Sequence, residues 1–183
     1  MQLQLMADSV SASALPAGLP AYAGYVDGAW PSFGAICARF GERAHCISIT
    51  ACGGNARIAD VEAGDLPPEG GARWLADRIP VQSGGLWTPL LARKLGIEPQ
   101  WRPGLYLPDS WLPETLRELA NLPRPLARSA YVLWVARWQT HRPKHLPAGW
   151  DAWQYLNDKD ANVDYSVYGQ RFVRGAKSVQ QSC

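Results

Sequence analysis

The sequence predicts an α/β protein, and specifically an abbreviated TIM-like (β/α)8 barrel with some helices shortened or missing. About eight short apolar runs with strand character alternate with segments typical of helices or loops, which is the pattern of βα units and a mostly parallel sheet. The chain has 183 residues, and a typical domain has roughly 150 residues, so one domain is expected. A full (β/α)8 barrel usually takes about 250 residues, so several helices must be absent. A doubly wound open sheet is the second alternative.

The first half of the chain contains four predicted strands and two predicted helices. The strands cover residues 2–6, 21–26, 44–50 and 56–62. Residues 31–40 predict a helix because apolar residues recur there at helical spacing after a proline. Residues 67–79 predict a second helix, since Pro67 and Pro68 begin it and Trp74, Leu75 and Ile79 share one face.

The second half continues the same alternation after a less regular segment. Residues 81–101 read as an inserted loop with a short helix at 87–95. Residues 113–120 predict a helix with acidic residues in its first turn. The remaining strands are predicted at 104–107, 131–138, 152–156 and 163–168. We therefore expect a single barrel domain over residues 1–173 and a loose tail over residues 174–183.

The charge and hydropathy patterns argue against two classes of partner. The 18 Lys and Arg against 16 Asp and Glu leave a formal net charge of +2 without a basic block, so no nucleic-acid partner is expected. No apolar run approaches the roughly 18 to 20 residues that cross a bilayer, so membrane insertion is not expected. The first ten residues lack a basic region followed by an apolar one, which predicts synthesis in the cytoplasm without a signal peptide.

The cysteines and histidines do not form a recognisable metal or nucleophile motif. The chain has no C-x-x-C pair and only three histidines, so we expect no metal and no cofactor. A hydrolase using Cys52 or Cys46 with His45 is a third functional alternative. It is disfavoured because His45 and Cys46 are adjacent, and adjacent residues on a strand face opposite sides.

The sharpest local feature is the D-x-E pair formed by Asp60 and Glu62 near the end of a predicted strand. Residues two apart on a strand point to the same face, so both carboxylates project together. Two such groups held close together raise the pKa of one of them, leaving one acid that donates a proton and one carboxylate that stabilises positive charge. Glycoside hydrolysis needs this division of labour.

Other polar and aromatic residues accompany this pair. Asp8, Asp27 and Asp164 fall at or near the ends of other predicted strands, and in barrels the carboxyl-terminal rim of the strands is where active sites form. Stacking surfaces and hydrogen bonds for a sugar are expected from Tyr106, Trp134 and Gln154. The nine tryptophans against three phenylalanines also suit a protein that handles sugars.

At these motifs the sequence resembles the glycoside hydrolase family 25 lysozymes, the N-acetylmuramidases of phages and bacteria, and more closely their short actinobacterial and actinophage relatives. The motifs arrive in the family's order over about 160 residues. They are ADSV at 7–10, GYVDG at 24–28, ADVEAGD at 59–65, LYLPDSW at 105–111, YVLWVARW at 131–138, AWQY at 152–155 and VDYSVY at 163–168.

The resemblance implies a role for each matched residue. Glu62 would be the general acid, and Asp60 would orient the substrate's 2-acetamido group as that group attacks the anomeric carbon. Asp8 and Asp164 would bind substrate or tune the acid, and Asp27 is a further substrate-binding candidate. The groove would be lined by Tyr106, Trp134 and Gln154.

Two functions remain open alongside the cysteine alternative. The first is a cell-wall glycan hydrolase that cleaves β-1,4 bonds of peptidoglycan as a phage endolysin or a bacterial autolysin. The second is a catalytically inactive carbohydrate-binding barrel of a phage virion or a surface assembly. A wall-active enzyme without a signal peptide would reach its substrate after cell lysis, release through a holin-type pore or delivery by a virion.

Overall fold

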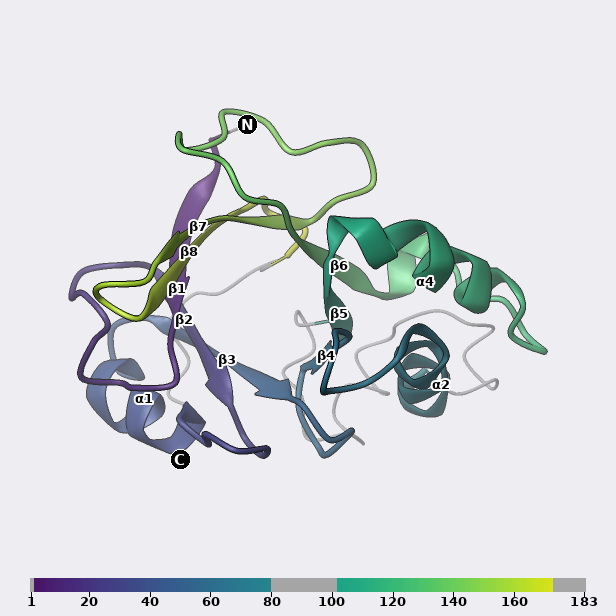
Figure 1. The fold of residues 1–183 in the computed structure, drawn as a ribbon, viewed down its shortest axis with the longest axis horizontal. Helices are drawn as coiled ribbons and strands as arrows, with labels where there is room; N and C mark the ends of the chain where they lie inside the picture. Colours follow the sequence, from purple (N-terminus) through teal and green to yellow (C-terminus); the bar gives the residue numbers. More distant parts are fainter. Residues whose placement is uncertain (1, 80–101, 173–183) are drawn as a thin grey trace.

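Eight strands pair in chain order and close into a barrel in the computed structural model, which describes residues 2–79 and 102–172 (Figure 1). The strands are β1 (Gln4–Asp8), β2 (Ala21–Tyr25), β3 (His45–Thr50), β4 (Ile58–Asp60), β5 (Gly104–Pro108), β6 (Val132–Ala136), β7 (Ala152–Asp158) and β8 (Val163–Tyr168). The predicted barrel is confirmed, and the open sheet is wrong. The predicted insertion at 81–101, its helix at 87–95 and the tail at 174–183 lie outside the described residues.

The last strand is the exception in the mostly parallel sheet that the sequence predicted. Consecutive strands from β1 to β7 are parallel, whereas β8 is antiparallel to both β7 and β1. Only residues 159–162 connect β7 to β8, and a parallel connection needs about a dozen residues or more. The reversal matters for function, because it brings the amino end of β8 to the carboxyl end of β1.

Three α-helices occur in the described part of the chain, and each lies where the sequence predicted a helix. They are α1 (Phe33–Phe40), α2 (Pro68–Arg78) and α4 (Leu112–Ala120), and short 3-10 turns lie at Asp109–Trp111 and Arg128–Ala130. The connections at 9–20, 51–57 and 137–151 contain no helix, so the barrel is abbreviated as expected. No helix among the described residues has the length and apolar character needed to cross a membrane.

The helices cover the barrel on two sides (Figure 1). Helix α1 packs against β2 and β3, whereas α2 and α4 pack together over β4 and β5. Gly24 allows the close approach of α1, because a Cβ atom there would lie 2.5 Å from Ile36 Cδ1 and 2.7 Å from Ser32 Oγ. Pro68 in the first turn of α2 begins that helix without losing a hydrogen bond.

Alternation along the strands separates an inner core from the outer helix-packed surfaces. The small residues Ala21 and Ala23 of β2 face inward and leave room for large side chains from other strands. Trp134 fills much of this space and packs edge-on against Tyr106 and Phe172. The middle of the barrel is therefore filled by side chains.

Candidate active site

The carboxyl ends of β1 to β7, together with the amino end of β8, form one end of the barrel, called the mouth here. Polar side chains occupy six of the inward-facing positions at the mouth, namely Asp8, Tyr25, Asp60, Tyr106, Gln154 and Asp164. Asp8 and Asp164 are direct partners in the β1–β8 ladder, and Asp60 is the partner of Tyr106 in the β4–β5 ladder. The closed barrel thus gathers acids that are far apart in sequence.

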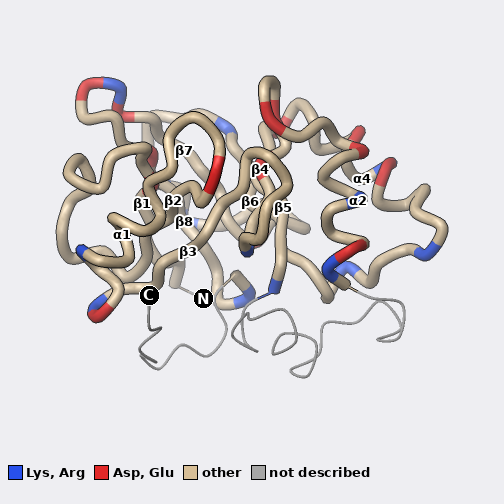
Figure 2. The backbone as a smooth tube through the Cα atoms, turned by 90° about the horizontal axis from the view of Figure 1, so that it is seen from below, with Lys and Arg blue, Asp and Glu red and all other residues tan. Residues whose placement is uncertain are grey.

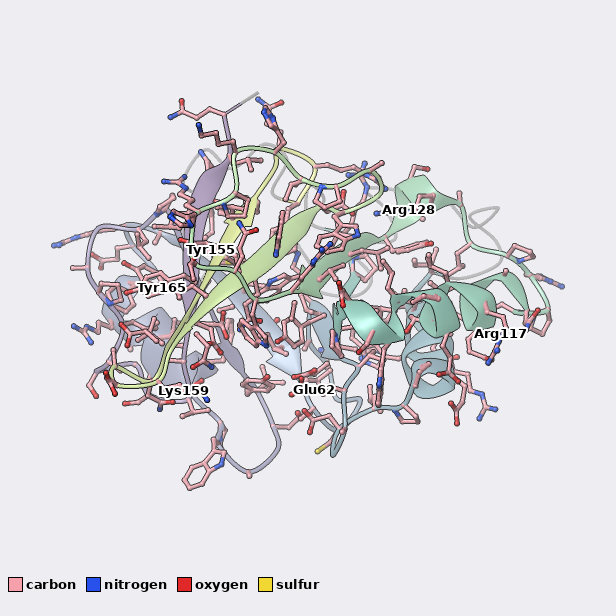
Figure 3. The ribbon with its side chains drawn as sticks, turned by 45° about the horizontal axis from the view of Figure 1, so that its top comes forward. Glu62, Arg117, Arg128, Tyr155, Lys159 and Tyr165 are labelled. Atoms are coloured by element: carbon pink, nitrogen blue, oxygen red, sulfur yellow. The ribbon has the colours of Figure 1, made fainter. Side chains whose placement is uncertain are left out.

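The distribution of charge along the barrel supports this assignment. Figure 2 shows acidic segments beside β4 and β7 at one end of the barrel and a basic segment below β5 at the other. In Figure 3 Glu62 lies at the mouth, with Lys159 of the β7–β8 turn to one side and Arg117 of α4 to the other. Within the mouth, after burial, the charges of neighbouring acids raise the pKa values of Asp8 and Glu62.

Asp60 is the most deeply placed acid of the mouth. Its side chain is fully buried, and the Tyr25 hydroxyl donates a hydrogen bond of 2.5 Å to its Oδ2 atom. Burial, and after it the negative field of Glu62, raises the pKa of Asp60 to about 8, although the Tyr25 hydrogen bond opposes the rise. Asp60 therefore keeps its proton at neutral pH.

Glu62 follows on the same face and belongs to a tight turn that brings in a third carboxyl group, Asp65. The Asp65 N–H donates to the Glu62 carbonyl at 3.1 Å and the Leu66 N–H to the Asp60 carbonyl at 3.2 Å. Gly64 adopts φ +101° within this turn, a conformation that favours glycine. Partial burial, and then the fields of Asp65 and Asp164, raise the pKa of Glu62 above its usual value.

The Asp60, Glu62 and Asp65 side chains each offer an oxygen, and these oxygens lie within 4.8 Å of one another. Such an arrangement has enough ligands to hold part of the coordination shell of a divalent cation. The raised pKa of Asp60 has another consequence, because a proton on that carboxyl already relieves much of the repulsion between the three groups. A proton shared between carboxyl groups is what acid–base chemistry requires of them.

Asp8 and Asp164 form the second acidic pair of the mouth. Burial, and then the field of Asp164, raises the pKa of Asp8. Burial raises the pKa of Asp164 to about 6, although hydrogen bonds with Gln154 and Asn157 oppose the rise. Asp164 lies at the amino end of β8, so it reaches the mouth only because that strand is antiparallel.

Several buried oxygen atoms at the mouth accept no hydrogen bond from a donor in the described part of the chain. They are Asp8 Oδ1, Asp60 Oδ1, Asp164 Oδ1 and Gln154 Oε1. The Gln154 amide oxygen and the oxygens of ionised carboxylates are acceptors, whereas Asp60 Oδ1 is the donor when Asp60 carries its proton, because Oδ2 already accepts from Tyr25. Burying an acceptor without a donor costs about 1 to 3 kcal/mol. A ligand that satisfies the acceptors must bring hydroxyl or N–H donors, as a sugar with an acetamido group does.

Asp27 lies beside this group, and its charge, after burial, raises the pKa of Asp65. Its Oδ2 accepts a hydrogen bond of 2.5 Å from the Thr50 hydroxyl, and its Oδ1 accepts one of 2.8 Å from the Ala51 N–H. Burial acts to raise the pKa of Asp27, but these hydrogen bonds outweigh it and hold the pKa below the usual value. The structure places Asp27 as a tie between the ends of β2 and β3.

The two predicted aromatic residues take different positions. Tyr106 is nearly buried at the mouth, where burial and then the field of Asp8 raise its pKa. Trp134 is fully buried, and its indole N–H donates to Ser166 Oγ at 3.0 Å in the barrel interior. The placement of Trp134 is that of a core residue that supports the mouth from below, since no surface of its ring is open to a sugar.

Tyr25 and Asp65 are the site residues that the sequence analysis missed. Tyr25 precedes Asp27 by two residues, so strand alternation alone pointed to an inward side chain at its position. Its bond to Asp60 depends on strands β2 and β4, which are separated by β3, and no local pattern reveals such a contact. Asp65 depends on the backward turn at Gly64, for which the A-G-D sequence was the available signal.

The cysteine alternative finds no support in the arrangement of β3. His45 begins this strand and Cys52 lies just beyond its end, so the two residues are at opposite ends of the barrel. Cys46 faces the outer surface, where it packs in the cluster that contains Tyr22 and Phe40. His45 and Cys46 are neighbours in β3, and their side chains face opposite sides of that strand.

Comparisons with known proteins identify similar folds. No family model matches the chain, and no curated protein sequence matches it. A glycoside hydrolase family 25 lysozyme from Aspergillus fumigatus is similar in structure, with 11% identity, coverage of 91% of this chain and 94% of that one, and a TM-score of 0.48. A bacterial lysozyme from Streptomyces coelicolor has 14% identity, coverage of 95% of this chain and 93% of that one, and a TM-score of 0.44.

A muramidase from Acremonium alcalophilum is also similar, with 14% identity, coverage of 86% of this chain and 83% of that one, and a TM-score of 0.39. At such identities the similarity concerns the path of the chain and does not extend to activity. The chain is thus similar in fold to lysozymes of this kind at low sequence identity.

Proposed function

We propose that this protein is a glycan hydrolase that cleaves β-1,4 bonds of peptidoglycan with the Asp60–Glu62 pair. One observation carries the proposal. Acids from β1, β8 and the end of β4 meet at one mouth, where Asp60 holds a proton up to about pH 8. A site of this kind supplies both a proton donor and a carboxylate within reach of one glycosidic bond.

In the proposed reaction Glu62 donates its proton to the glycosidic oxygen as the bond from that oxygen to the anomeric carbon breaks. On the sugar that carries this anomeric carbon, the carbonyl oxygen of the 2-acetamido group forms a bond to that carbon. Asp60 accepts a hydrogen bond from the acetamido N–H, which makes the carbonyl oxygen a stronger nucleophile. Water then opens the cyclic intermediate and returns a proton to Glu62, so the net reaction consumes one water molecule.

The spacing of the carboxyl groups favours this substrate-assisted route over an inverting one. Oxygens of Asp60 and Glu62 lie within 4.8 Å of each other, whereas inverting pairs stand about 6.5 to 9.5 Å apart to hold a water between them. For the reaction to start, the proton of the pair must lie on Glu62. A substrate N–H that donates to Asp60 favours this distribution, because it stabilises the ionised form of Asp60.

The remaining mouth residues are proposed to bind the substrate. Asp8, Asp164 and Gln154 provide the acceptor oxygens that lack protein donors, and Tyr106 borders them. Asp27 is proposed to hold the rim, and Trp134 to support it from the core. The protein would act at the cell wall after lysis, holin-type release or virion delivery, and the sequence motifs favour a phage or actinobacterial setting.

The experiment is the release of new reducing ends from purified cell wall by the wild type, Glu62→Gln and Asp60→Asn. We expect Glu62→Gln to lose at least about a hundredfold in rate, the usual contribution of a general acid. Glu69→Gln, at an exposed position in the first turn of α2, is the matched control and should retain full activity. Activity that survives in both mouth variants would exclude the proposed roles of the pair.

A carbohydrate-binding barrel without activity is the second candidate function. The buried acceptors at the mouth favour it as well, since they would bind a sugar whether or not a bond is broken. A wild type that releases no reducing ends but sediments with purified cell wall would establish binding in place of hydrolysis.

A further inference from the structure

Two tryptophans are exposed to an extent that folding alone does not explain. Trp30 is 68% exposed and Trp138 is 57% exposed, whereas the other strongly exposed large apolar residues of the described chain reach 37% to 41%. An exposed indole forgoes the stabilisation that burying its large apolar surface would provide. Tryptophan is enriched at binding surfaces, where its ring is covered by a partner and its N–H stays hydrogen-bonded.

Trp138 is held rigidly above the mouth by a continuation of the sheet. Beyond the end of β6, the Arg137 N–H donates to the Gln154 carbonyl at 3.0 Å and the Gln139 N–H to the Tyr155 carbonyl at 2.7 Å. These bonds hold the segment that carries Trp138 against β7, so Trp138 lies at the mouth end of the barrel, two residues beyond the inward-facing Ala136.

Trp30 belongs to a loop that leaves the mouth at the end of β2 and returns to it. The Ser32 N–H donates to the Tyr25 carbonyl at 2.9 Å, and the Ser32 hydroxyl donates to the Ser9 carbonyl at 3.0 Å. Asp27 fixes the start of the same loop to Ala51 at the end of β3. The loop is pinned at both ends, so Trp30 is presented by a fixed support beside Tyr25.

The two indoles stand on opposite sides of the mouth. Strands β2 and β6 are four places apart in a closed ring of eight, which puts their ends across the barrel from each other. The acids and the unpaired acceptors of the mouth lie between them. The surface thus has one indole on each side and hydrogen-bonding groups between them. A protein partner usually binds to a single contiguous apolar patch, which this arrangement does not form.

We propose that Trp30 and Trp138 are stacking platforms that bind a linear glycan of several sugar rings across the mouth. Each indole would cover the apolar face of one sugar ring, while the ring between them presents its hydroxyl and acetamido donors to the acceptors of Asp8, Asp164 and Gln154. The proposal rests on the proposed function and adds that the substrate is a chain longer than its disaccharide repeat.

The test measures binding by the full chain carrying Glu62→Gln, so that turnover does not consume the probe. The probes are the disaccharide repeat unit of peptidoglycan and soluble uncrosslinked glycan strands several repeats long, followed by calorimetry. Trp30→Ala and Trp138→Ala, each added to this background, should weaken strand binding about three- to tenfold, from the usual strength of aromatic stacking. Affinity for the disaccharide, which fills only the centre, should stay within about twofold of the parent.

Two further variants separate stacking from a loss of structure. Trp30→Phe and Trp138→Phe keep an aromatic face and should recover most of the strand affinity, and Leu116→Ala removes an exposed apolar side chain from α4 and should change neither affinity. Strand binding that is equal in the parent and both alanine variants would overturn the platforms while leaving the proposed function standing. A parent that binds neither probe would overturn both, and would indicate that the indoles face another class of partner.

Discussion

Replacing Asp60 by Asn should stabilise the protein increasingly as the pH rises. In the folded chain burial, and then Glu62, raises the pKa of Asp60 to about 8, against an ordinary value of 3.8. The folded state therefore holds this proton more tightly than the unfolded state. The resulting stabilisation is fully present below about pH 4 and is lost as the pH rises through about 8. Asparagine keeps the shape of the side chain and removes the ionisation.

The size of the effect follows from the two pKa values. They differ by about four pH units, and each unit corresponds to about 1.4 kcal/mol, so the upper limit is about 6 kcal/mol. Rearrangement of the side chains and entry of water around the ionised group reduce this limit. Between about pH 5 and pH 8 we expect Asp60→Asn to gain about 2 to 4 kcal/mol relative to the wild type.

The assay is urea denaturation of both proteins at several pH values across this range. Asp77→Asn, which removes a carboxylate from an exposed position of α2, is the control. A difference between Asp60→Asn and the wild type that stays constant from about pH 5 to pH 8 would refute the reasoning. Asp60 would then be ionised in the folded state at neutral pH, and the proton of the pair could not lie on Asp60.

Three other perturbations test separate parts of the site. Tyr25→Phe removes the hydrogen bond that lowers the pKa of Asp60, so the alkaline limb of the pH–rate profile should move to higher pH. Asp65→Asn removes a negative charge that raises the pKa of Glu62, so the same limb should move to lower pH; a limb that moves the other way in either variant contradicts the assignment. Gly54→Ala should lower the free energy of unfolding by about 1 to 3 kcal/mol, because an added Cβ would overlap Asp27 Oδ2. An unchanged denaturation midpoint would argue against the hydrogen bonds by which Asp27 joins the ends of β2 and β3. Gly34→Ala in α1, where a Cβ meets nothing within 4 Å, is its control.

The positions of strands and helices were largely readable from the sequence, because apolar alternation and proline-initiated helices are local signals. The predicted helix at 67–79 matches α2, and the predicted strand at 163–168 matches β8. The direction of β8 was not readable, since it depends on how short the connection is once β7 extends to Asp158. Local patterns predict elements, whereas strand direction depends on where the elements end.

The candidate site also combines features that local patterns predict with features that depend on the whole fold. Asp60 and Glu62 share a face as strand alternation predicted, and Asp8 meets Asp164 because the barrel closes. Trp134 was expected to line a groove and lies in the core, since nothing in an aromatic residue's own sequence neighbourhood distinguishes the middle of a strand from its end. Trp138, four residues further along, has the exposure that was expected of Trp134.

The most direct test of the central claim is a crystal structure of Glu62→Gln with a bound peptidoglycan fragment. The account predicts that the fragment crosses the mouth, with a glycosidic oxygen within hydrogen-bond distance of the side chain at position 62. It also predicts that the acetamido N–H of the adjoining sugar donates to Asp60. A fragment bound elsewhere on the barrel, or one that crosses the mouth with both carboxyl positions out of reach of any glycosidic bond, would contradict the account.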